Sequence, residues 1–184
     1  MEAHHAISQL NDLELAILVC LTAGEHCIIR TSDHLLDRAQ KGLEDCVSSV
    51  FNLVSVSLRY GTDDDFNVLG HALSEKTTMY YMAPDSSGQT LQSQVNVVIA
   101  RDLNHAPGRV QIEALEFIRS RSLVQEDKVL VLQPPFLFVA LISDDAAGPP
   151  FFTPHLVRTT WLSRSRRLSR VNHKKSKSTD DHPE

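Results

Sequence analysis

A nearly unbroken apolar run at residues 95–100 (VNVVIA) constrains the fold of this chain most strongly. A strand that is exposed on one face alternates apolar and polar residues, whereas a strand covered on both faces is apolar throughout. Residues 26–30 (HCIIR) and 136–142 (FLFVALI) are similarly apolar, and residues 53–58 (LVSVSL) alternate. Together with residues 129–132, these patterns predict a buried, mostly parallel sheet.

Helical patterns lie between the predicted strands. Asn11 and Glu14 have the spacing of a capping box, Ser32 is a candidate N-cap, and Pro107 suits the first turn of a helix. Four helices are expected: residues 11–23, 33–51, 65–73 and 107–118. Residues 84–94 (PDSSGQTLQSQ) have the composition of a loop. Helices that alternate with buried strands predict an α/β fold, a three-layer α/β/α sandwich.

Charge divides the chain into two unequal parts. The 184 residues carry a formal net charge of −5, and 42% of them are hydrophobic, which is enough for one compact domain. Residues 1–157 carry a formal charge of −10, whereas residues 158–184 carry +5. The basic, Ser-rich end has too few apolar residues to offset its ordering entropy. We therefore expect a folded domain at residues 1–162 and a basic, disordered tail at residues 163–184.

Cysteine usage and hydropathy bear on the cellular compartment. Cys20, Cys27 and Cys46 form no CxxC pair and are odd in number, which argues against a disulfide framework and fits a reducing compartment. No apolar run reaches about 18 residues, so no transmembrane segment is expected. The N-terminal residues lack the basic region of a signal peptide. The expected location is intracellular, either cytoplasmic or nuclear.

Residues 97–118 (VVIARDLNHAPGRVQIEALEFI) resemble the second nucleotide motif of AAA+ ATPases of the MoxR and magnesium-chelatase type. Six positions match that motif at unchanged spacing: Asn104, Ala106, Pro107, Val110, Gln111 and Leu115. Three further segments resemble the family in chain order. Residues 15–31 resemble the helix and strand before the phosphate loop, residues 135–143 the sensor strand, and residues 155–162 the later Leu-Asp-Arg-Phe element. The resemblance implies a P-loop NTPase-like fold, and no helical lid is expected after residue 162.

The resemblance also assigns the catalytic positions, and most of them carry the wrong residue. Arg101 stands at the metal-associated Asp position, where a guanidinium cannot hold Mg²⁺, and Asp102 stands at the catalytic Glu position. Ser143 replaces the sensor Asn, and Arg158 lies at the arginine-finger position. Arg101 either replaces the charge of the metal or simply contacts Asp102 or the backbone at the strand end. The site is therefore predicted to be degenerate, with no confident catalytic residue.

The phosphate loop is missing altogether. The pattern GxxxxGK[ST] occurs nowhere in the chain, and residues 31–38 (TSDHLLDR) follow the first strand without Gly or Lys. The next helix is expected to begin at about Asp33. Asp33 and Asp37 would repel phosphate there, although they complement the helix dipole. We therefore predict no bound cofactor; ATP and Mg²⁺ would be required only if the chain were an active ATPase.

Other motifs give weaker indications. The nine histidines show no HExxH or equivalent pair, and the acidic residues 63–65 fit a solvated turn better than a cation site, so no metal is expected. Ser169 follows Arg-Arg-Leu, the pattern that basophilic kinases select, and is a candidate phosphorylation site.

Three function hypotheses remain. The first is a non-hydrolysing AAA+-like binding or assembly module, with a protein partner or a homo-oligomer. The second is an active magnesium-chelatase-type ATPase subunit that works with partner subunits. The third is a nucleic-acid-associated adaptor, in which residues 158–177 bind nucleic acid or another anionic surface weakly.

Overall fold

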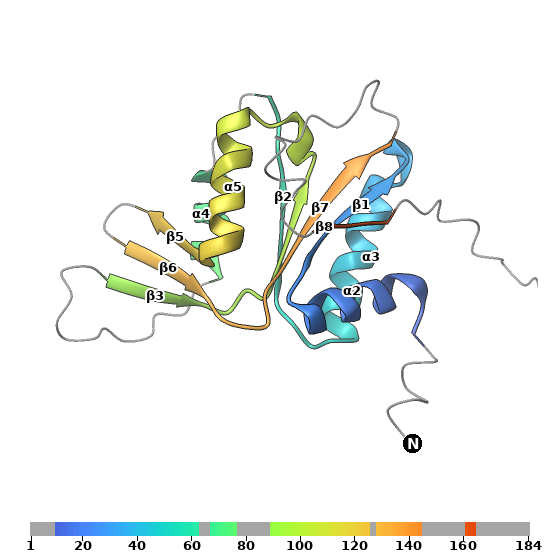
Figure 1. Ribbon diagram of the computed structural model, residues 1–184, viewed down its shortest axis with the longest axis horizontal. Coiled ribbons are helices and arrows are strands. Elements are labelled where there is room, and N and C mark those ends of the chain that lie inside the picture. The colour runs from blue at the N-terminus through green and yellow to red at the C-terminus, as the bar shows by residue number, and fades with distance from the viewer. Residues whose placement is uncertain (1–9, 63–66, 77–88, 126–127, 145–160, 165–184) are drawn as a thin grey trace, which may run out of the picture.

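The computed structural model describes residues 10–62, 67–76, 89–125, 128–144 and 161–164 of the chain. Its centre is a five-stranded sheet in the order β2-β4-β7-β1-β8, and every neighbouring pair in it is parallel (Figure 1). The five strands are β1 (His26–Thr31), β2 (Ser55–Arg59), β4 (Val97–Arg101), β7 (Leu137–Ser143) and β8 (Trp161–Arg164).

Helices cover both faces of this sheet. On one face lie α2 (Asp12–Ala23) and α3 (Leu36–Ser49), and on the other lie α4 (Asn67–Glu75) and α5 (Gly108–Ser120) (Figure 1). Short 3₁₀ turns precede α3 and α5: η1 (Asp33–Leu35) and η2 (Leu103–His105). The predicted α/β fold with a mostly parallel sheet flanked by helices is therefore confirmed.

The central strands explain why an apolar run predicted this architecture. Every residue of β4 and β7 is buried. Side chains alternate between the faces of a strand, so Val97 and Ile99 pack with α2 and α3, whereas Val98 and Ala100 pack with α4 and α5. Because both faces are covered, the strand has no polar alternation.

A second, smaller sheet was not predicted, and the strand predicted at residues 129–132 lies in it rather than in the main sheet. The order of this smaller sheet is β3-β6-β5, with β3 (Gln89–Ser93) parallel and β5 (Ser122–Gln125) antiparallel to β6 (Lys128–Leu132). The loop predicted at 84–94 is therefore wrong for residues 89–93. The sequence of β3, QTLQS, has a single apolar residue, and β5, SLVQ, is only four residues long. Neither segment alternates apolar and polar residues, which is the pattern that indicates a strand.

Several local expectations need correction. Ser32 makes no side-chain hydrogen bond to the helix that follows it, and Pro107 is the N-cap residue of α5 rather than part of its first turn. The capping box of α2 is present as predicted, because Asn11 and Glu14 bond each other's backbone N–H groups. The strand β8, Trp161–Arg164, was not predicted from the sequence. No helix among the described residues is long and apolar enough to cross a membrane.

Candidate functional site

The carboxyl ends of the parallel strands meet at one edge of the main sheet. The strand order reverses between β1 and β7, since the chain passes from β1 to the far strand β2, returns through β4 and β7, and then adds β8 on the other side of β1. Open α/β sheets bind ligands outside the carboxyl ends of the strands, at such a reversal. Five of the residues at this edge are Thr31, Arg59, Arg101, Asp102 and Ser143.

At the end of β1 the chain turns into helical structure after a single residue. Thr31 ends β1, Ser32 connects, and η1 begins at Asp33. A phosphate loop places about eight residues at this point, so that successive backbone N–H groups surround the phosphates. Here the connection offers no such loop. The carbonyl of Thr31 also accepts a hydrogen bond from the N–H of Asp144, 2.8 Å away, which joins the ends of β1 and β7.

Arg101 links β4 to the opposite helix layer. Its guanidinium forms an ion pair with Asp37 in the first turn of α3, and its Nε lies 3.4 Å from Oδ2 of Asp102. The Arg101 side chain is buried, although its partner Asp37 is exposed. Arg101 therefore contacts two carboxylates, one from α3 and one from the residue next to it.

Asp102 is fixed through both its backbone and its side chain. Its φ and ψ of 59° and 23° are left-handed, a conformation that Asp tolerates better than most residues. Its N–H donates to the carbonyl of Leu141 at 3.0 Å, and its carboxylate accepts from Nε of Arg59 at 3.1 Å. Because two arginines surround the Asp102 carboxylate, it is not positioned as an isolated general base.

A further ion pair and a buried hydroxyl complete this edge. Nε of Arg30 lies 3.1 Å from Oδ1 of Asp144, directly after β7. Ser143, the residue at the sensor position, is buried at the end of β7 and pairs with Thr31 across the strands. We call Arg30, Asp37, Arg59, Arg101, Asp102 and Asp144 the edge network. It comprises three arginines and three aspartates, so its formal charges balance.

The edge network does not fit Mg²⁺ and ATP. Mg²⁺ requires oxygen ligands, and the metal-associated position carries the cationic Arg101, already paired with Asp37 and Asp102. A triphosphate requires backbone N–H groups and a cation at the end of β1, where the structure places Asp33 and the start of η1. The residues described at this edge therefore do not fit the donor set that Mg²⁺ and a triphosphate require.

Several of the predicted site residues lie outside the part of the chain that the structure describes. Arg158 and Ser169 lie outside the described residues, as do Asp63, Asp64 and Asp65. Most of the predicted tail, from residue 165 onward, also lies outside them. No group of three or more metal-ligating side chains occurs within the described part of the chain.

His26 is not a dispersed surface histidine. It is buried in β1, its Nδ1 accepts a hydrogen bond from the N–H of Phe138 at 3.0 Å, and its ring lies 5.4 Å from that of Phe136. Burial and, to a smaller extent, the charge of Arg121 lower the pKa of His26 to about 4. The neutral ring is therefore a structural hydrogen-bond acceptor at physiological pH.

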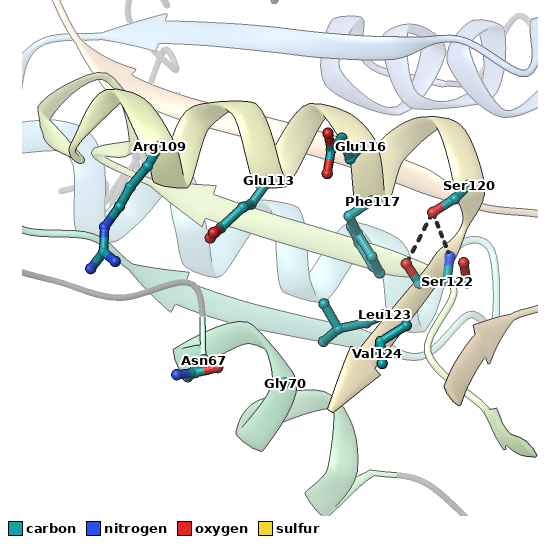
Figure 2. A pocket seen from close by; sticks show the side chains of 10 residues that line it. All are labelled: Asn67, Gly70, Arg109, Glu113, Glu116, Phe117, Ser120, Ser122, Leu123 and Val124. Atoms are coloured by element: carbon teal, nitrogen blue, oxygen red, sulfur yellow. Dashed lines mark hydrogen bonds between the residues drawn. The ribbon is translucent and has the colours of Figure 1, made fainter. Parts of the chain in front are cut away.

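A cavity of about 630 Å³ lies away from the edge network and shares no residue with it. It is formed where α4, α5 and β5 meet (Figure 2). Ten residues line it: Asn67, Gly70, Arg109, Glu113, Glu116, Phe117, Ser120, Ser122, Leu123 and Val124. The sequence does not indicate this cavity because it depends on β5, which was not predicted, and on the packing of two helices beside it.

Comparison with known proteins supports the fold and nothing more specific. No protein-family model matches the chain, and no curated protein matches it. One solved structure that matches is described as a "putative ATPase" from Cytophaga hutchinsonii, with a TM-score of 0.56 and 16% sequence identity. The match covers 84% of this chain and 46% of that protein, so the chain spans about half its length. The chain therefore shares the fold of part of that protein.

Proposed function

We propose that this chain is a non-hydrolysing AAA+-like module, related to the MoxR and magnesium-chelatase ATPases, that acts by binding or assembly. The observation that carries this proposal is the pairing of Arg101 with Asp37 and Asp102. The pair with Asp37 joins β4 to α3, and both pairs lie at the strand ends where a nucleotide and its metal would bind in an ATPase of this fold. In this proposal the chain keeps the sheet and helices of such an ATPase, while its own side chains fill the edge of the sheet where the nucleotide would bind.

Electrostatics support the loss of nucleotide binding. Mg²⁺ at this edge would lie beside the Arg101 guanidinium, which repels it. A phosphate group attracted to Arg101 would have to displace Asp37 and would then lie close to Asp102 and Asp33. With a single residue between β1 and η1, no set of backbone N–H groups compensates that repulsion.

If the edge does not bind nucleotide, binding of a partner is the activity that we propose for this domain. Ion pairs join α3 to β4, β2 to the residue after β4, and β1 to the residue after β7, so side chains of the protein itself occupy this edge. A domain of this kind can hold a protein partner, or copies of itself, without turnover. The basic tail predicted from the sequence and the candidate phosphorylation site at Ser169 are also proposals.

Calorimetric titration of the full chain with ATP and ADP, with and without Mg²⁺, tests the proposal. We expect no saturable binding up to about 1 mM nucleotide and no phosphate release above a protein-free blank. Arg101→Asp restores a carboxylate at the metal-associated position and should still not bind, because the phosphate loop is missing. Arg119→Asp, on the exposed side of α5, is the control for the same charge change.

Micromolar nucleotide affinity with Mg²⁺-dependent turnover would overturn this proposal. It would instead favour the hypothesis of an active chelatase-type ATPase subunit.

A further inference from the structure

The exposed edge of β5 borders the cavity formed by α4, α5 and β5. Three consecutive residues of β5, Ser122, Leu123 and Val124, all line the cavity. Successive side chains of a strand point to opposite faces, so a cavity on one face would contact every second residue. Contact with all three indicates that the cavity lies along the edge of the strand.

The register of β5 against β6 determines which backbone groups face this edge. Leu132 donates its N–H to the carbonyl of Arg121, so Arg121 and Leu132 form a hydrogen-bonded pair. Hydrogen-bonded and non-bonded pairs alternate along an antiparallel ladder. The N–H and C=O groups of Leu123 therefore face β6, and those of Ser122 and Val124 face away from it.

The two outward-facing residues differ in their hydrogen bonds. The hydroxyl of Ser120 donates to the carbonyl of Ser122 at 3.0 Å and accepts from its N–H at 3.2 Å, which occupies both groups (Figure 2). Val124 has no such partner within the described part of the chain, and 71% of the residue is exposed. An exposed apolar residue with an outward N–H and C=O is the arrangement to which an added strand binds.

The charged groups of the cavity favour a basic occupant. Its lining includes two carboxylates, Glu113 and Glu116, and neither forms an ion pair or hydrogen bond within the described part of the chain. Arg109 also lines the cavity, but it is already engaged in an interaction. Phe117 and Leu123 add apolar surface between the carboxylates and Val124 (Figure 2).

We propose that β5 binds an extended peptide of a partner protein, which adds a strand beside Val124 and places a Lys or Arg side chain near Glu113. The backbone of the peptide bonds the N–H and C=O of Val124, and its apolar side chains contact Phe117 and Leu123. This site goes beyond the proposed function, since it lies apart from the edge network and is independent of whether the chain binds nucleotide.

The probe is a display library of randomised linear decapeptides, selected on the immobilised full chain. Enriched peptides are then synthesised with a fluorescent label, and their affinity is measured by anisotropy. We expect the enriched sequences to carry Lys or Arg among β-branched residues. Their binding should weaken as salt is raised, because it depends partly on the carboxylate of Glu113.

Two variants test the two parts of the site separately. Val124→Pro removes the outward N–H and should weaken binding about tenfold, whereas Val124→Thr retains the N–H and should change affinity by less than about threefold. Glu113→Lys reverses the charge and should weaken binding by about tenfold or more, while Glu75→Lys, at the end of α4 and outside the cavity lining, should not. Because the N–H of Val124 does not bond β6, the proline leaves that ladder intact. Circular dichroism checks the fold, and Glu113→Lys remains informative if the proline variant unfolds.

Three results would overturn the proposal. The first is a selection that enriches no peptide above the unselected library. The second is peptides that bind Val124→Pro and Glu113→Lys as tightly as the unmodified protein. The third is a dimer of the full chain, seen by light scattering, that Val124→Pro converts to monomer. In that case a second copy of the chain occupies β5.

Discussion

Arg101 and its sequence neighbour Asp102 form an ion pair in which both side chains are nearly removed from water. Their exposed fractions are 11% and 8%, and Nε of Arg101 lies 3.4 Å from Oδ2 of Asp102. The other partner of Arg101, Asp37, is 91% exposed. One guanidinium thus holds a buried carboxylate and a solvated one, and the two pairs should contribute very differently to stability.

Arg101→Ala is expected to lower the free energy of unfolding by about 2–3 kcal/mol. The substitution leaves the buried carboxylate of Asp102 with only Arg59 as an ionic partner, and breaking a buried pair on one side costs several kcal/mol. Asp37→Ala removes the exposed pair and should cost less than about 1 kcal/mol. Urea unfolding followed by circular dichroism measures both. Equal losses in the two variants would contradict the assignment of the buried pair as the important one.

The sequence contained enough information to predict the strands β1, β2, β4 and β7 of the main sheet and the helices that cover it, but not β8. The unbroken apolar runs of β4 and β7 could be satisfied only by burial on both faces. The capping box of α2 was predictable because it is local, with both hydrogen bonds spanning three residues. Two strands of the small sheet, β3 and β5, were not predictable, since the sequence of β3 has a single apolar residue and β3 pairs with β6, which is distant in the chain.

The contacts of the candidate sites also divide into local contacts, which the sequence could indicate, and long-range contacts, which it could not. A contact between Arg101 and Asp102 was one of two alternatives that the sequence left open, because the two residues are neighbours. The ion pair between Arg101 and Asp37 spans 64 residues, and nothing in the local pattern around either residue indicates it. The cavity beside β5 also depends on elements that are far apart in the chain, α4 and α5. Local sequence patterns contain no information on such contacts.

The buried ring of His26 predicts a loss of stability under mildly acidic conditions. Its pKa is about 4 in the folded protein, against about 6.5 in an unfolded chain. Between these values the unfolded state binds more protons, so stability is complete above about pH 6.5 and falls as the pH is lowered towards 4, by up to about 3 kcal/mol. Urea unfolding at a series of pH values measures this slope.

His26→Gln should flatten the pH dependence, because the amide oxygen can still accept from the N–H of Phe138 but does not titrate in this range. His71→Gln, on the exposed side of α4, is the matched control for the same substitution. An unchanged slope in His26→Gln would show that another group causes the acid sensitivity.

Arg121→Gly is expected to stabilise the protein by about 0.5–1 kcal/mol. Arg121 ends α5 in the left-handed region, with φ of 54°, where a Cβ atom is unfavourable and glycine is not. Its N–H bonds Phe117 and its carbonyl accepts from Leu132, and glycine retains both groups. Thermal unfolding of the variant beside Arg121→Ala, which keeps the Cβ, measures the backbone contribution. A gain in the alanine variant as large as in the glycine variant would rule out relief of backbone strain as the cause.

The same position should also affect His26. Since the charge of Arg121 helps to lower the pKa of His26, both Arg121→Gly and Arg121→Ala should raise that pKa from its value of about 4. Proton NMR titration of the imidazole follows the change. Burial is the larger cause and is unaffected by either substitution, so the pKa should remain below 6.5. An unchanged pKa in both variants would show that burial alone sets it.

Asn11→Ala is expected to lower the free energy of unfolding by about 1 kcal/mol. The side chain of Asn11 accepts from the N–H groups of Leu13 and Glu14 at 2.9 and 3.0 Å, and the Glu14 carboxylate accepts from the N–H of Asn11 at 2.7 Å. Asn11→Asp keeps the acceptor and adds a charge favourable to the helix dipole, so it should cost nothing. Because α2 packs on β1 through the buried side chains of Ile17 and Cys20, fraying of its first turn should appear as faster amide exchange in α2 before the sheet opens. Equal stability of the Ala and Asp variants would mean that packing alone holds the start of α2.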